Sequence, residues 1–116
     1  MITSLSEQLE IKPDSKIEIH LDNSIKSLAH FFNLDYDNNT KNIKSIDFSH
    51  FDSSLITDMN SLFFGCTSLQ QLDLNNFITK SETLISNMFS GCNNLKYLDI
   101  SGFNISSYDF IKDLIN

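Results

Sequence analysis

The sequence contains no arginine and no tryptophan, and only one proline, three glycines and two cysteines in 116 residues. Without arginine, and with a formal net charge of −7, the chain lacks the basic surface and guanidinium forks that bind nucleic-acid phosphates. The scarcity of glycine and proline excludes collagen-like and low-complexity classes. No apolar run approaches the roughly 18 residues of a membrane-spanning helix. These absences favour a protein partner with a basic surface over nucleic acid or a membrane.

The N-terminus lacks the basic and apolar segments of a secretory signal, because Glu7 and Glu10 interrupt its apolar residues. With Met1 as the start, this predicts a cytoplasmic protein. In that compartment Cys66 and Cys92 are expected to be reduced thiols.

The dominant feature of the sequence is an internal repeat with an offset of 26 residues. Residues 43–68 align with 69–94 without a gap, and a third copy, 95–116, stops before its Gly-Cys end. Pairs shared by the first two copies are Asp47/Asp73, Phe51/Phe77, Thr57/Thr83, Phe63/Phe89, Gly65/Gly91 and Cys66/Cys92. We expect one continuous domain, in which residues 1–42 form an N-terminal cap and a divergent repeat, and residues 43–116 form three repeats, the last truncated.

Each copy combines two patterns of apolar residues. The first alternates with period two, as in Leu72 and Leu74, and predicts a short strand. The second places apolar residues at i, i+1, i+4 and i+5, beginning at Leu84, and predicts a short helix. Such a unit must stack on its neighbours to bury its apolar side. The predicted fold is an α/β repeat, a short leucine-rich-repeat-like solenoid with a parallel sheet on one side and short helices on the other.

The order and spacing of these residues resemble the BspA-like leucine-rich repeat of bacterial surface proteins and mycoplasma-type lipoproteins. The similarity covers about residues 43–103, and its most specific part is the ending M-x-x-L-F-x-G-C at residues 59–66. The resemblance implies a leucine-rich-repeat-like solenoid that binds rather than catalyses. It supplies no catalytic residue, and it implies a role in long, exported arrays.

One repeat position holds an aspartate in every copy: Asp47, Asp73 and Asp99. On adjacent parallel strands these residues would form a column spaced by about 4.8 Å. In a structural hypothesis, each carboxylate accepts hydrogen bonds from the turn that follows it. In a functional hypothesis, the column receives a lysine or arginine from a partner, or a divalent cation. The two hypotheses are compatible.

Residues between the buried strand positions point outward and form the predicted protein-binding surface. Tyr97 is its one aromatic anchor, and tyrosine is enriched in binding hot spots. The predicted binding residues are Ser45, Asp47, Gln71, Asp73, Asn75, Tyr97, Asp99 and Ser101. The alternative is a solvated sheet face with an incidental tyrosine.

Metal binding and catalysis have little support in the sequence. Cys66 and Cys92 share a repeat position, which favours a buried thiol ladder and leaves a disulfide as the alternative. Neither cysteine has a second Cys or His at zinc spacing, so we expect no metal site. No nucleophile elbow or phosphate-binding glycine loop is present, so we expect no cofactor, no catalytic residue and no enzyme activity.

The sequence therefore predicts a non-catalytic protein–protein interaction module. Our first hypothesis is a small acidic intracellular binder or inhibitor that masks a basic protein surface, such as that of a nucleic-acid-handling host or defence enzyme. The second is a fragment of a BspA-like surface adhesin or scaffold. The unfinished third copy also leaves residues 97–101 as an unpaired edge, which invites a homodimer or a partner's strand unless the last helix covers it.

Overall fold

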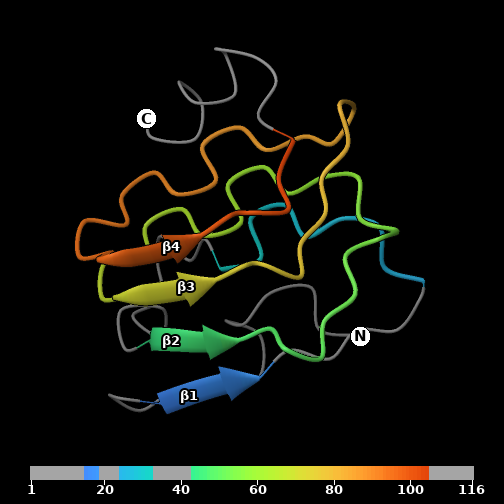
Figure 1. Cartoon of the computed structure of the whole chain (residues 1–116). Coiled ribbons are helices and arrows are strands. Elements are labelled where there is room, and N and C mark those ends of the chain that lie inside the picture. Colours follow the sequence, from blue (N-terminus) through green and yellow to red (C-terminus); the bar gives the residue numbers. More distant parts are fainter. Residues whose placement is uncertain (1–14, 19–23, 33–42, 105–116) are drawn as a thin grey trace.

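A four-stranded parallel sheet forms one side of the molecule (Figure 1). The computed structural model describes residues 15–18, 24–32 and 43–104. The strands are β1 (Ser15–Glu18), β2 (Ile43–Asp47), β3 (Gln71–Asp73) and β4 (Tyr97–Asp99), and they lie in the order β1-β2-β3-β4. Leu72 lies opposite Leu98 on the neighbouring strand, and Asp73 lies opposite Asp99. The 26-residue offset of the sequence is thus the pairing register of β2, β3 and β4.

The parallel sheet agrees with the period-two pattern, but the predicted helices on the other side are wrong. The described residues contain strands and turns and no helix, so the predicted α/β fold class is also wrong. Most of the predicted N-terminal cap and the end of the third repeat, including its expected last helix, lie outside the described residues.

Successive turns take the place of the helices, in three segments that we call the turn ladder: residues 27–32, 58–66 and 84–92. Within a segment, the N–H groups of Leu62 and Cys66 donate to carbonyls three residues earlier. Alternate N–H groups donate instead to the following repeat. Met59 donates to the Leu84 carbonyl at 2.8 Å, and Phe63 donates to the Met88 carbonyl at 3.0 Å. These groups are therefore unavailable for the i to i−4 bonds of a helix.

Backbone conformation also prevents a helix in the turn ladder. His30, Ser61 and Asn87 occupy related places in the three segments and have φ angles of 60°, 57° and 56°. These values lie in the left-handed region, which interrupts a right-handed helix. The apolar stripe survives because turns of this length also bring residues three and four apart to one side: Met59, Leu62, Phe63 and Cys66 are all buried.

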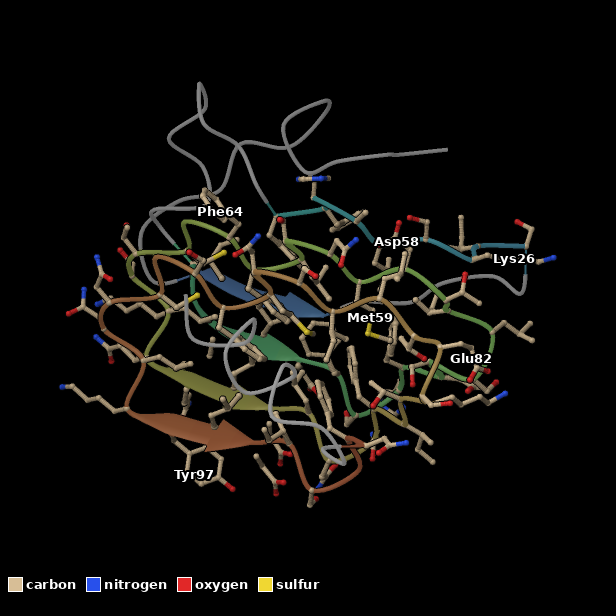
Figure 2. The ribbon with its side chains drawn as sticks, turned by 90° about the horizontal axis from the view of Figure 1, so that it is seen from above. Lys26, Asp58, Met59, Phe64, Glu82 and Tyr97 are labelled. Carbon is tan, nitrogen blue, oxygen red and sulfur yellow. The ribbon has the colours of Figure 1, made fainter. Side chains whose placement is uncertain are left out.

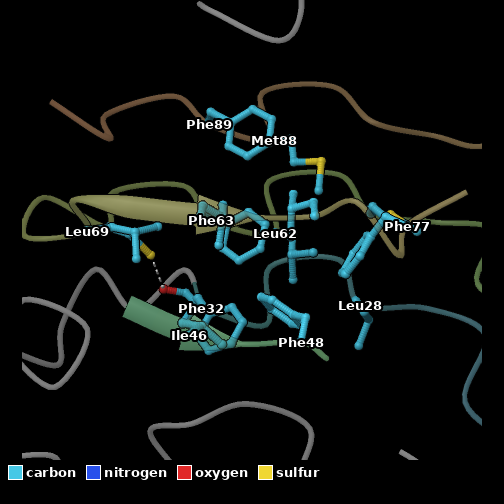
Figure 3. Packing of buried hydrophobic residues seen from close by; sticks show 14 of the residues in the cluster. Leu28, Phe32, Ile46, Phe48, Leu62, Phe63, Leu69, Phe77, Met88 and Phe89 are labelled. Atoms are coloured by element: carbon cyan, nitrogen blue, oxygen red, sulfur yellow. Dashed lines mark hydrogen bonds between the residues drawn. The ribbon is translucent and has the colours of Figure 1, made fainter. Parts of the chain in front are cut away.

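The hydrophobic core lies between the sheet and the turn ladder and continues from repeat to repeat (Figure 3). Phe32, Phe63 and Phe89 stack with ring centroids 5.5 Å and 5.7 Å apart. Phe51 and Phe77 stack at 4.8 Å. Equivalent side chains thus pack on one another, and each repeat covers the apolar surface of the next.

Two buried hydroxyl groups satisfy backbone groups between repeats. Ser53 accepts the N–H of Ile78 at 3.0 Å, and Thr79 accepts the N–H of Asn104 at 2.8 Å. Because Ser53 and Thr79 lie 26 residues apart, the same hydrogen bond recurs at the same place. Burial of these polar groups costs little when each has its partner.

We expect Leu72→Ala to lower the free energy of unfolding by roughly 2 to 5 kcal/mol, because it leaves a cavity beside the fully packed core. Ile78→Ala is the control, since the Ile78 side chain is 63% exposed and its N–H bond to Ser53 is retained; we expect a change within about 0.5 kcal/mol. Urea denaturation measures both. Equal losses in the two variants would contradict the packing described.

Gly65 and Gly91 offer a matched test of the contact between repeats. Both have positive φ, 76° and 81°, so alanine at either position should cost about 1 to 2 kcal/mol. A Cβ at Gly91 would also lie 3.2 Å from the Cα and N atoms of Gly65, whereas a Cβ at Gly65 meets nothing within 4 Å. Thermal denaturation should therefore show a larger loss for Gly91→Ala. A larger loss for Gly65→Ala would contradict this stacking.

Candidate functional site

The outer face of the sheet carries a pocket built by three successive strands. Strand alternation buries Leu72 and leaves Gln71 and Asp73 exposed beside it. The pocket has a volume of about 280 Å³. We call it the sheet-face pocket, and its lining residues are Ser45, Ile46, Asp47, Gln71, Asp73 and Tyr97.

The lining residues form two rows across the strands. Ser45 pairs with Gln71, and Gln71 pairs with Tyr97, so that the first row runs from β2 to β4. Asp47 and Asp73 belong to the second row, which continues to Asp99 on β4. The structure thus brings together five of the residues predicted from the sequence: Ser45, Asp47, Gln71, Asp73 and Tyr97. Their role in binding stays a prediction.

Tyr97 is the aromatic wall of the sheet-face pocket. Its side chain is 53% exposed, and Figure 2 shows it projecting from β4 away from Met59 in the core. Leu55, Ile78 and Leu84 are the other large apolar side chains with high exposure in the described residues, and they lie outside the strands. The ring of Tyr97 is therefore an apolar surface exposed to solvent at one position on the sheet.

Each aspartate of the row holds the turn that follows its strand. The Asp47, Asp73 and Asp99 carboxylates accept the N–H two residues later, at 2.8, 3.0 and 2.9 Å. The structural hypothesis for this row is therefore confirmed. A carboxylate has about four acceptor sites, so the bond from the Asn75 N–H uses only part of the acceptor capacity of Asp73.

The predicted residues Asn75 and Ser101 lie in these turns and not in the sheet-face pocket. Both are exposed, and both donate their backbone N–H to the preceding aspartate. Asp99 likewise does not line the pocket. Ile46 was missed by sequence reasoning because it is a buried strand residue, 6% exposed, that nevertheless contributes to the lining.

Hydrogen bonding favours the charged form of Asp99 at the end of β4. The N–H of Ser101 lowers the pKa of Asp99, the hydroxyl of Ser101 adds to this effect, and burial opposes it weakly. Neighbouring strands lie about 4.8 Å apart, and two carboxylates at that separation would repel by about 1 kcal/mol at water-like dielectric. A cation placed between two of them would relieve this repulsion.

The two cysteines are free thiols in equivalent positions. The Cys66 Sγ donates to the Phe32 carbonyl at 3.9 Å, and the Cys92 Sγ donates to the Phe63 carbonyl at 3.1 Å. Burial raises the pKa of the Cys66 thiol and raises the pKa of Cys92 to about 11. Both therefore stay protonated at neutral pH and are poor nucleophiles.

Other chemistry has few candidates. In residues 15–18, 24–32 and 43–104, no three His, Cys, Asp or Glu side chains gather closely enough to hold a metal ion. The same residues contain no helix with the length and apolar character needed to cross a bilayer. The residues after Asn104 lie outside the described part, so pairing at the edge of β4 stays a prediction.

These features define a repeat protein in which one parallel sheet presents a pocket to solvent. The model of the family described as Mycoplasma protein of unknown function, DUF285, matches residues 23–116. The chain therefore belongs to this family, which agrees with the mycoplasma part of the resemblance but carries no leucine-rich-repeat or BspA assignment. Neither the curated proteins nor the solved structures gave a match.

The thiol environment predicts slow chemical modification. At pH 8 only about one Cys92 thiol in a thousand should be ionised, given its pKa of about 11, and Cys66 lies deeper. We expect neither thiol of the folded protein to react with Ellman's reagent within minutes, and both to react at once in urea. As the pH approaches 10, Cys92 should react before Cys66, with Cys66→Ala and Cys92→Ala identifying each signal. Rapid modification of Cys66 at pH 8 would contradict its burial.

Proposed function

We propose that this protein is a non-catalytic protein-binding module whose contact surface is the outer face of the sheet. The sheet-face pocket is the observation that carries the proposal, because three repeats contribute to its lining. One supplies the half-buried Ser45 and Asp47, the next the exposed Gln71 and Asp73, and the third the exposed ring of Tyr97. Tyrosine in such a position combines apolar contact area with little loss of side-chain entropy on binding. Side chains on the buried side of the sheet pack in the core, whereas those of Tyr97 and Gln71 do not.

We further propose that the module belongs to a mycoplasma surface protein of the BspA-like adhesin or scaffold type. Membership in the Mycoplasma family supports this hypothesis over the intracellular inhibitor. The net charge of −7 suits a basic protein surface in either setting. The cytoplasmic location expected from the N-terminus is the competing prediction.

Photo-crosslinking tests the contact surface. We would place benzoylphenylalanine at Gln71 in the sheet-face pocket, and at Glu82 as the control. Glu82 is exposed, and Figure 2 shows it away from Tyr97. On intact source cells and cultured animal cells, we expect crosslinked adducts from position 71. Excess protein without benzoylphenylalanine should suppress these adducts. Excess Tyr97→Ala protein should suppress them at least about tenfold less well, a loss typical of an interface anchor. Equal adducts from both positions would contradict the proposal.

Protease treatment of intact source cells tests the location. A surface protein should be cleaved without lysis, while a cytoplasmic enzyme of the same cells should remain intact. Cleavage of this protein only after lysis would favour the intracellular binder and remove the surface role.

A further inference from the structure

The sheet-face pocket combines two carboxylates with an aromatic ring. Carboxylates of Asp47 and Asp73 come from neighbouring strands, and the Tyr97 ring lies on the same pocket. Ser45, Ile46 and Gln71 complete the lining. A cation that also has a flat surface would contact both the carboxylates and the ring.

The carboxylates are held in place before any ligand arrives. Asp73 is fixed by the N–H of Asn75 at 3.0 Å, and Asp47 by the N–H of Ser49 at 2.8 Å. Because these bonds orient the side chains through the turn, binding would cost little further side-chain entropy. Neighbouring strands lie about 4.8 Å apart, a separation that a single branched donor can span.

Arginine fits this arrangement better than the other cations. Its guanidinium presents five N–H donors in a plane, binds carboxylates through two donors and stacks on aromatic rings. Lysine is a compact and strongly hydrated charge with no such plane. A calcium ion takes six to eight oxygen ligands, and no three metal-binding side chains gather in the described residues.

The chain's own composition decides where the arginine comes from. These 116 residues contain no arginine, so neither they nor a second copy of them can supply the group. An arginine-specific pocket would therefore stay available at high local concentrations of the protein itself. We assign the arginine to a partner protein, in line with the proposed function.

We infer that the sheet-face pocket binds the guanidinium group of an arginine on the partner protein, between Asp47 and Asp73 and against Tyr97. This inference rests on the proposed protein-binding function and specifies its chemistry.

Nuclear magnetic resonance titration tests the inference with a defined probe. We would add N-acetyl-arginine methylamide to the ¹⁵N-labelled full chain, and compare it with N-acetyl-citrulline methylamide, which has the same shape without the charge. We expect saturable shifts at Asp47, Gln71, Asp73 and Tyr97 with the arginine probe, and at least tenfold weaker binding of the citrulline probe. The corresponding lysine probe should also bind several-fold more weakly. Equal binding of citrulline or lysine would overturn the inference.

Variants locate the binding. Asp73→Asn should weaken binding of the arginine probe about tenfold, and Tyr97→Leu should weaken it several-fold, with spectra that otherwise resemble those of the wild type. Asp52→Asn is the matched control, because Asp52 is exposed and accepts the N–H two residues later, Ser54, but does not line the pocket. Equal effects of Asp52→Asn and Asp73→Asn would show non-specific charge attraction and overturn the inference.

The two proposals fail in different ways. If photo-crosslinking identifies a partner on the sheet face but the arginine probe does not bind, the protein-binding function stands and the arginine inference is wrong. If the arginine probe binds as expected but no specific adduct forms from position 71, the pocket chemistry stands and the proposed function is wrong.

Discussion

The rest of the structure depends on hydrogen bonds that each repeat makes with the next one. The Gln70 N–H donates to the Lys44 carbonyl, and the Lys96 N–H donates to the Gln70 carbonyl, so the sheet is continued at one repeat position. The turn ladder does the same through Met59 and Leu84. A single repeat can satisfy neither its polar backbone nor its apolar side chains alone, because the partners of both lie in neighbouring repeats. Stacking in register is therefore required for folding, and it places equivalent side chains in rows.

The strands and the aspartate row could be predicted from the sequence, whereas the turn ladder could not. Alternation around Leu72 fixes which side chains face inward, and the constant offset fixes that Asp73 lies opposite Asp99. The stripe that includes Met59, Leu62 and Phe63 is ambiguous, since a helix and a run of tight turns bury the same positions. The residues that decide between them are Ser61 and Asn87, whose positive φ carries no glycine signal. Only the packing of neighbouring repeats determines that the turn-ladder segments form backbone hydrogen bonds with one another.

The sheet face separates a constant structural row from a variable row. Aspartate recurs at 47, 73 and 99 because each strand needs a side chain that holds the next turn. The neighbouring row of Ser45, Gln71 and Tyr97 does not hold the turns, and its residues differ from one repeat to the next. This arrangement explains why the pocket could be predicted only in outline. Sequence spacing placed the residues on one face, but it did not determine that Ile46 lines the pocket and that Asp99 does not.

The free cysteines do not decide between a cytoplasmic and a surface location. A reduced thiol usually points to the cytosol, because exposed thiols in an oxidising environment form disulfides. Here desolvation raises the pKa of both thiols, and each one donates to a carbonyl of the preceding repeat. Oxidation and disulfide exchange require the thiolate and access to it. Burial among stacked repeats suppresses both, so these cysteines can stay reduced outside the cell as well. The free thiols are thus compatible with the proposed surface role. Their recurrence at one position of the repeat follows from packing and not from redox chemistry.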